Sequence, residues 1–205
     1  WYFLWIRNPI RRFVSSFNYV KSIVEFDISG YEACGLSLEN CPDPSKIIRK
    51  VRTGYAYETV YDSLVKSFAS ANELAESLSS NNNDLRRMAY KLMTNRYEHL
   101  FKGVGWYLSN GLFVEKFHRQ IYFVGCLEKY DTDFKVLSEM LDLPINNREK
   151  LGKIRVAKNH LSTELSQKAV SNIRNFYSDT DYRAIRTLAN LNLIDPDIVD
   201  QYYDL

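Results

Sequence analysis

The opening stretch of the chain changes from a run of bulky apolar residues to a helical repeat. Six such residues, Trp1 to Ile6, are typical of a buried strand, and the first charge follows at Arg7. Asn8 can cap a helix, and Pro9 suits its first turn, where a missing N–H is tolerated. The apolar positions that follow have helical spacing and predict a stripe packed against the strand: Ile10, Phe13, Val14, Phe17, Val20 and Val24.

Helical periodicity also dominates most of the remaining chain. Segment 29–45 contains Gly, Pro and Cys residues and is predicted to be a loop. The predicted helices lie in 47–68, in 72–78, in 85–93 with Asp84 as the N-cap, and in a C-terminal series that begins at Ser162.

A second strand is predicted near the middle of the chain. Ile121 to Gly125 is apolar enough for a buried strand, and a helical stripe follows that ends at Pro144: Tyr130, Phe134, Leu137, Leu141 and Leu143. Two strands among many helices predict an α/β fold, mostly helical, with a small parallel sheet. We expect a single domain, 1–205, made of a strand–turn–helix (1–28), a helical and loop region (29–119), a strand–helix unit (120–144), a basic loop (145–161) and C-terminal helices (162–205).

Composition narrows the class of protein. The 205 residues are 45% hydrophobic and include 15 Tyr, 11 Phe and 3 Trp, which is enough for one folded domain and unlike a disordered chain. A formal charge of +2 gives no reason to expect nucleic acid or a membrane surface as a partner, so any basic site must be local. The longest apolar run is Trp1 to Ile6, so no signal peptide or transmembrane segment is predicted, and we expect the natural beginning to lie upstream of Trp1.

The three cysteines lack metal-ligand spacing, and no metal site is predicted. Cys34 and Cys41 lie in one predicted loop and could form a disulfide, whereas free thiols would fit a reducing compartment, and Cys126 remains alone in either case. The chain also has no Asn-x-Ser/Thr acceptor for glycosylation. Together these features favour a cytoplasmic protein of microbial origin.

The turn after the first strand is suited to an anion. Arg7 would leave the carboxyl end of that strand beside the positive end of a helix dipole and its free backbone N–H groups. Ser15, about 100° around the helix from Val14, lies off the apolar stripe and could add a hydroxyl donor. An Arg fork with a hydroxyl fits a phosphate monoester better than a carboxylate. The alternative is an ordinary strand–turn–helix whose basic start faces solvent.

Arg7-Asn8-Pro9 followed by Arg12-Phe13-Val14-Ser15 resembles the 3′-phosphate signature of PAPS-dependent sulfotransferases, in particular their carbohydrate-type branch. The resemblance implies that Arg7 and Ser15 bind the 3′-phosphate of PAPS, within a P-loop-like sulfotransferase fold. The expected reaction is transfer of a sulfuryl group from PAPS to a hydroxyl or amine of a carbohydrate or another small acceptor, releasing PAP.

Two later segments are similar to the same family. Gly125-Cys126-Leu127-Glu128, after the second strand, resembles its Gly-x-x-Glu turn, and Tyr177 to Tyr182 resembles its closing Tyr-x-x-x-Asp-Tyr stretch, which we expect to pack the C-terminal helix. The family often closes over the nucleotide with a basic loop. If loop 145–161 corresponds to it, Arg155 and Lys158 would meet the phosphates; the alternative is a solvated basic loop.

The family's Lys-x-Gly-Thr loop for the 5′-phosphosulfate, with its strand, does not occur in this sequence and is expected upstream of Trp1. No catalytic base is assigned; His99, His118 and His160 are candidates as the chain's histidines. Two other functions remain open: a P-loop-type kinase, and a non-catalytic helical interaction domain with an anion-binding turn.

Overall fold

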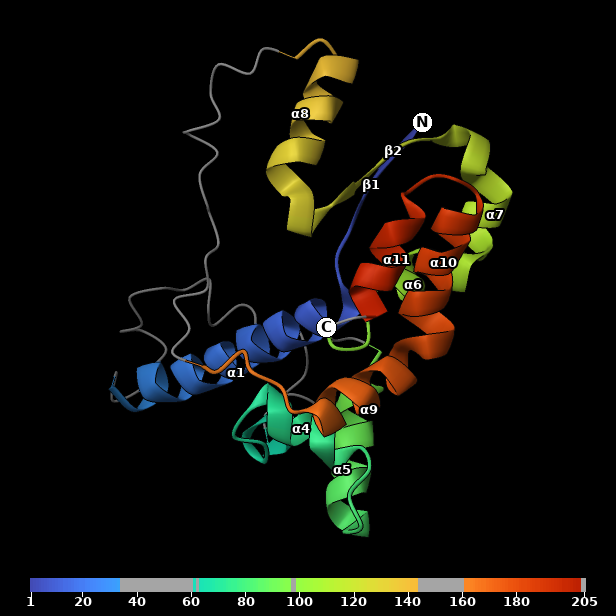
Figure 1. The fold of residues 1–205 in the computed structure, drawn as a ribbon. Helices are drawn as coiled ribbons and strands as arrows, with labels where there is room; N and C mark the ends of the chain where they lie inside the picture. Colours follow the sequence, from blue (N-terminus) through green and yellow to red (C-terminus); the bar gives the residue numbers. More distant parts are fainter. Residues whose placement is uncertain (34–60, 62, 97–98, 144–160, 204–205) are drawn as a thin grey trace.

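A two-stranded parallel sheet and a larger set of helices make up the described chain (Figure 1). The computed structural model describes residues 1–33, 61, 63–96, 99–143 and 161–203. Strands β1 (Tyr2–Ile6) and β2 (Ile121–Cys126) pair in parallel, with Ile6 opposite Cys126. This confirms the prediction of a mostly helical α/β chain with a small parallel sheet.

The helices follow the chain from the first strand to the C-terminal end. The longer ones are α1 (Pro9–Ala33), α4 (Ala71–Ser77), α5 (Asn83–Met93), α8 (Tyr130–Met140), α9 (Gln167–Tyr177), α10 (Arg183–Asn190) and α11 (Pro196–Tyr203). Shorter ones are α6 (Val104–Tyr107), α7 (Leu112–Phe117), the 3₁₀ turns η2 (Ser109–Gly111), η3 (His118–Gln120) and η4 (Leu127–Lys129), and the π-helical turn η6 (Ser178–Tyr182). None of the helices in the described ranges combines the length and the apolar character needed to cross a membrane.

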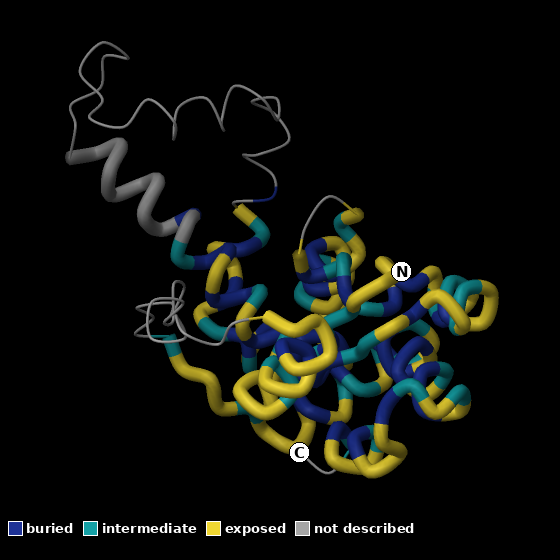
Figure 2. Tube along the Cα trace, turned by 90° about the horizontal axis from the view of Figure 1, so that it is seen from above, coloured by how far each residue is buried: buried dark blue, intermediate teal, exposed yellow. Residues whose placement is uncertain are grey.

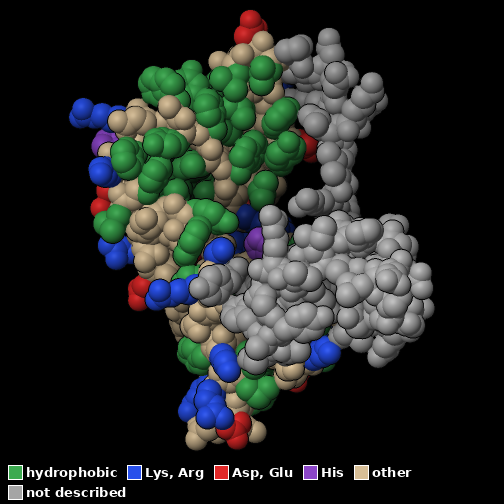
Figure 3. Space-filling view, turned by 180° about the vertical axis from the view of Figure 1, so that it is seen from behind, with side chains coloured by type: hydrophobic (Ala, Val, Ile, Leu, Met, Phe, Trp, Pro, Cys, Tyr) green, Lys and Arg blue, Asp and Glu red, His purple; other side chains and the backbone are tan. Residues whose placement is uncertain are grey.

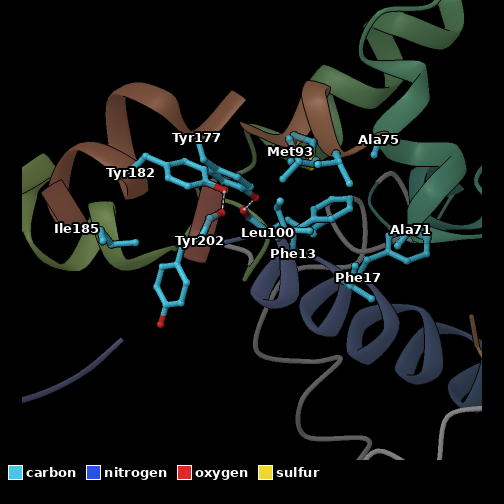
Figure 4. Packing of buried hydrophobic residues seen from close by; sticks show 14 of the residues in the cluster. Phe13, Phe17, Ala71, Ala75, Met93, Leu100, Tyr177, Tyr182, Ile185 and Tyr202 are labelled. Carbon is cyan, nitrogen blue, oxygen red and sulfur yellow. Dashed lines mark hydrogen bonds between the residues drawn. The ribbon is translucent and has the colours of Figure 1, made fainter. Parts of the chain in front are cut away.

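Helix α1 begins where the sequence predicts, and its apolar stripe is fully buried. The stripe packs chiefly against α4 and α9, two partners that the sequence did not predict. Figure 4 shows Phe13 and Phe17 pointing from α1 toward Ala71, Ala75 and Met93. An apolar helix stripe can be buried against any apolar surface. The sequence therefore indicates that the stripe is buried, but it does not indicate which element covers it.

The core lies among the helices, beside the sheet and not around it. Figure 2 shows the buried segments gathered in the interior of the helical part. Tyr177 and Tyr182 are among the largest buried side chains, and each hydroxyl finds a backbone acceptor (Figure 4). Tyr177 Oη donates to the Leu100 carbonyl at 2.5 Å, and Tyr182 Oη donates to the Tyr202 carbonyl at 3.2 Å. These bonds make the burial of two polar tips tolerable.

The prediction of two buried strands is wrong for most of β1. Ile6 is buried, but Trp1, Tyr2 and Phe3 keep 81, 38 and 42% of their surface exposed. Each strand has one paired neighbour among the described residues. A sheet of two strands is narrow, so many of its side chains remain in contact with solvent. Figure 3 shows hydrophobic side chains gathered over one face of the molecule.

Helix α8 forms after β2 as predicted, but its stripe is only partly covered. Leu137 is buried, whereas Tyr130, Leu141 and Leu143 are at least 40% exposed. Tyr130 packs on Trp5 with ring centroids 5.0 Å apart, which places the first turn of α8 against one face of the sheet. The predicted end at Pro144 lies outside the described residues, and the helix ends at Met140.

Three predicted boundaries move by a few residues. Helix α1 continues to Ala33, into the segment predicted as a loop. Helix α5 is capped by Asn82 and not by Asp84, because the Asn82 side chain accepts from two first-turn N–H groups. Helix α9 is capped by Ser166, whereas the predicted start, Ser162, forms a local turn with the Glu164 N–H. Several cap-type residues stand close together at each of these helix starts, so local sequence alone does not choose between them.

Candidate phosphate site at the strand ends

The carboxyl ends of both strands meet at one edge of the sheet. Because Ile6 and Cys126 are paired, the residues that follow them, Arg7-Asn8 and Leu127-Glu128, emerge together. Tyr202 of α11 reaches the same place. We call Arg7, Asn8, Glu128 and Tyr202 the strand-end corner. In open parallel sheets, ligands bind outside the carboxyl ends of the strands.

Asn8 organises the first turn of α1 and is itself fully buried. Its Oδ1 accepts from the N–H groups of Ile10 at 2.8 Å and Arg11 at 3.2 Å. Its own N–H donates to Glu128 Oε1 at 3.1 Å. The free backbone N–H groups that the sequence led us to expect here therefore already have acceptors within the chain. Buried N–H groups are rarely left unpaired, and a carboxylate is favourable at a helix N-terminus.

Arg7 is the cation of the strand-end corner, and its guanidinium is uncommitted. It is partly buried and makes no hydrogen bond or ion pair with any residue that the structure describes. Burial lowers its pKa from the ordinary value, Glu128 opposes this change, and Arg11 and Arg12 add to it. A partly desolvated guanidinium next to two further cations is favourable for an incoming anion.

Ser15 and Arg11 lie on the exposed side of the same helix. Arg11 and Ser15, four positions apart, share one side of the first turns of α1, whereas Arg7 precedes the helix. Ser15 lies about 9 Å along the axis from Pro9, the first residue of α1, and Arg7 lies before Pro9, so a single phosphate bridges Arg7 and Ser15 only with the help of a long side chain. The sequence analysis did not single out Arg11; the four-residue spacing is the signal that could have found it.

Arg12, the second arginine of the signature, points inward. Its Nε lies 3.1 Å from Asp181 Oδ2, and its Nη1 donates to the His99 carbonyl at 2.8 Å. The guanidinium also lies over the Tyr177 ring, 4.7 Å from the centroid. Burial by itself would lower the pKa of Arg12, but Tyr177 and Asp181 outweigh burial and raise it. Arg12 is thus held by the protein and is not offered to a ligand.

The signature segments at 125–128 and 177–182 both contact the first signature. Glu128 binds the Asn8 N–H, and Asp181 binds Arg12. Gly125 is required because the Trp5 indole lies against it: a Cβ there would be 2.5 Å from Trp5 Cζ3. Three stretches far apart in sequence therefore meet around the start of α1, and the last of them does more than pack the C-terminal helix.

Neither His99 nor His118, the two histidines that the structure describes, supplies an evident base at the strand-end corner. The His99 ring packs edge-on against Tyr19, with centroids 5.8 Å apart. His118 Nδ1 lies 3.0 Å from the Glu115 carbonyl, in a turn that precedes β2 and so lies at the opposite edge of the sheet. His160, Arg155, Lys158, Cys34 and Cys41 lie outside the described residues.

Cys126 is a free and buried cysteine at the end of β2. Burial raises the pKa of its thiol to about 11, so the thiol is neutral near pH 7. Within the described ranges, no three His, Cys, Asp or Glu side chains are grouped so that they could hold a metal ion. No family model, curated protein or solved structure matches this chain.

Proposed function

We propose that the strand-end corner binds the 3′-phosphate of PAPS and that the chain is the nucleotide-binding part of a sulfotransferase with a P-loop-like fold. Arg7 would provide the cationic fork, and Ser15 a neutral hydroxyl donor. Arg11, between them, would contact the same phosphate from the solvent side. The observation that carries the proposal is the partly buried Arg7 guanidinium at the carboxyl end of β1, which has no hydrogen bond or ion pair with a described residue.

The proposed reaction moves a sulfuryl group between two oxygens, or from oxygen to nitrogen. The acceptor hydroxyl or amine attacks the sulfur of PAPS, the bond from sulfur to the bridging phosphate oxygen breaks, and PAP leaves. The acceptor proton passes to a base, and the resemblance suggests a carbohydrate-like acceptor. The strand-end corner would act by holding the non-reacting end of the nucleotide, which positions the sulfur for in-line attack.

Because the first-turn N–H groups are already paired, binding here must depend on side chains. We therefore expect Arg7→Ala to weaken PAP binding about 10- to 100-fold, since charge-assisted hydrogen bonds contribute about 1.5–3 kcal/mol. Ser15→Ala should weaken it by about two- to tenfold, and Arg11→Ala by an intermediate factor. Isothermal titration with PAP measures all three changes.

Arg87→Ala is the matched control, because Arg87 is 81% exposed on α5 and pairs with Asp84. It should leave PAP affinity unchanged. Titration with ADP tests the kinase alternative: tighter binding of ADP than of PAP would contradict the sulfotransferase proposal. Binding of inorganic phosphate with equal or greater affinity than PAP would support the anion-binding interaction domain instead.

A further inference from the structure

Glu128 uses both of its carboxylate oxygens to join three elements. Oε1 accepts the Asn8 N–H at 3.1 Å, and Oε2 accepts the Tyr202 hydroxyl at 2.8 Å. Residue 128 follows β2, residue 8 precedes α1, and residue 202 belongs to α11. A single carboxylate therefore ties the end of the second strand to the turn that carries Arg7.

Tyr202, which donates to this carboxylate, is itself buried and hydrogen-bonded. Its side chain is 4% exposed, and its carbonyl accepts both the Tyr182 hydroxyl at 3.2 Å and Asn8 Nδ2 at 3.5 Å. Figure 4 shows the contact between Tyr182 and Tyr202. The Glu128 carboxylate is consequently held from a buried and hydrogen-bonded position, although residue 128 itself is exposed.

The bond to the Asn8 N–H matters because it fixes the peptide group that joins Arg7 to Asn8. Pro9 has no N–H, and the Asn8 side chain is engaged with Ile10 and Arg11, so Glu128 is the acceptor that orients this peptide plane. The direction in which the Arg7 side chain leaves the backbone depends on that plane. Binding sites gain affinity when such hydrogen bonds hold a binding side chain of the protein in place before the ligand arrives.

We propose that Glu128, held by Tyr202, is a positioning residue for Arg7 and that phosphate affinity depends on its hydrogen bonds and not on its charge. This inference rests on the proposed function. The negative charge of Glu128 next to Arg7 by itself opposes an anion, so a neutral residue that keeps one hydrogen bond to Asn8 and one to Tyr202 should bind at least as well as Glu. Gln is such a residue: its carbonyl accepts the Asn8 N–H and its amide donates to Tyr202 Oη, so the second hydrogen bond is kept with donor and acceptor exchanged.

The experiment compares PAP affinity by isothermal titration for the 205-residue wild type and four variants. Glu128→Ala should weaken PAP binding about tenfold, and Tyr202→Phe should weaken it by a smaller factor. Glu128→Gln should bind within about threefold of the wild type or more tightly. Glu139→Ala is the matched control, since the Glu139 carboxylate is 60% exposed on α8 and lies 3.8 Å from Lys135.

Hydrogen exchange of the Asn8 amide gives a second readout that needs no nucleotide. It should be protected in the wild type and in Glu128→Gln, and faster in Glu128→Ala with the thermal midpoint little changed. Wild-type affinity in Glu128→Ala would overturn the inference and leave the proposed function standing. Affinity in Glu128→Gln as low as in Glu128→Ala would also overturn it. Failure of the wild type to bind PAP would overturn the proposed function together with the inference.

Discussion

Two arginines five positions apart in the first signature have opposite surroundings. The Arg7 guanidinium has no hydrogen bond or ion pair within the described part of the chain, whereas the Arg12 side chain is 14% exposed and bound to the 1% exposed Asp181. Asp181 also accepts the Gly105 N–H at 2.9 Å, so both its oxygens are engaged. The difference follows from the position of each residue relative to α1. Position 12 is next to the buried stripe, whereas position 7 lies before the first residue of the helix, Pro9. One signature thus combines the residue that we propose as a phosphate ligand with a structural one.

We expect Arg12→Ala to lower the free energy of unfolding by about 3–5 kcal/mol, because the Asp181 carboxylate would stay buried without its cation. Denaturation in urea measures the change. Arg87→Ala removes an exposed pair with Asp84, 3.1 Å apart, and should change the free energy by less than about 1 kcal/mol. Equal effects of the two substitutions would contradict a structural role for Arg12.

At the scale of elements, two helix starts, those of α1 and α5, are capped in the same way by an asparagine. Asn8 and Asn82 both accept from two first-turn N–H groups with Oδ1, at distances between 2.8 and 3.2 Å. They differ in their surroundings, since Asn8 is fully buried whereas the Asn82 cap is in solvent. Asn8 also reaches the Tyr202 carbonyl with Nδ2.

This pair of caps allows a matched comparison. Asn82→Ala should lower the free energy of unfolding by about 1 kcal/mol, the usual contribution of an N-cap. Asn8→Ala should lower it by about 2–3 kcal/mol, because water is less able to replace the lost acceptor at a buried turn. Thermal unfolding of the two variants tests this order, and a larger loss for Asn82→Ala would contradict it.

The start of α1 and the second strand were predictable because their signals are local. Asn8-Pro9 marks a cap within two residues, and the stripe from Ile10 to Val24 repeats over four turns. Glu128, Tyr202 and Asp181 could not be placed in this way, because their partners lie 120, 74 and 169 positions away. The exposure of β1 was missed for the same reason, since burial depends on what neighbours a strand and not on its own apolar character.

On the scale of the whole molecule, three tyrosine hydroxyls of the C-terminal helices and one thiol at the end of β2 are buried. Burial raises the pKa of Cys126 to about 11 and that of Tyr182 to about 12, and it also raises the pKa values of Tyr177 and Tyr202. All four groups are neutral when protonated. In the unfolded chain they release protons at their ordinary, lower pKa values.

Stability should therefore fall in alkali. Below about pH 8 both states keep these protons and the thermal midpoint should be nearly constant. As the pH rises from about 8 toward 12 the unfolded chain ionises first, at the Cys126 thiol and then at the tyrosines, so stability should decrease. Calorimetric scans from pH 7 to 11 measure the midpoint. Tyr182→Phe should flatten the decline, and a constant midpoint up to pH 11 would contradict the prediction.

The bond between Asn8 and the Tyr202 carbonyl spans 194 positions, which has a consequence for biosynthesis. Ribosomes add about 5–20 residues per second, so the start of α1 waits roughly 10–40 s after its synthesis before Tyr202 is made. During that interval the apolar stretch from Trp1 to Ile6 and the adjoining Arg7 lack the contacts that Tyr202 makes in the folded protein. Chaperones that hold emerging polypeptides could bind this stretch during the interval, and the strand-end corner can assemble only after Tyr202 has been made.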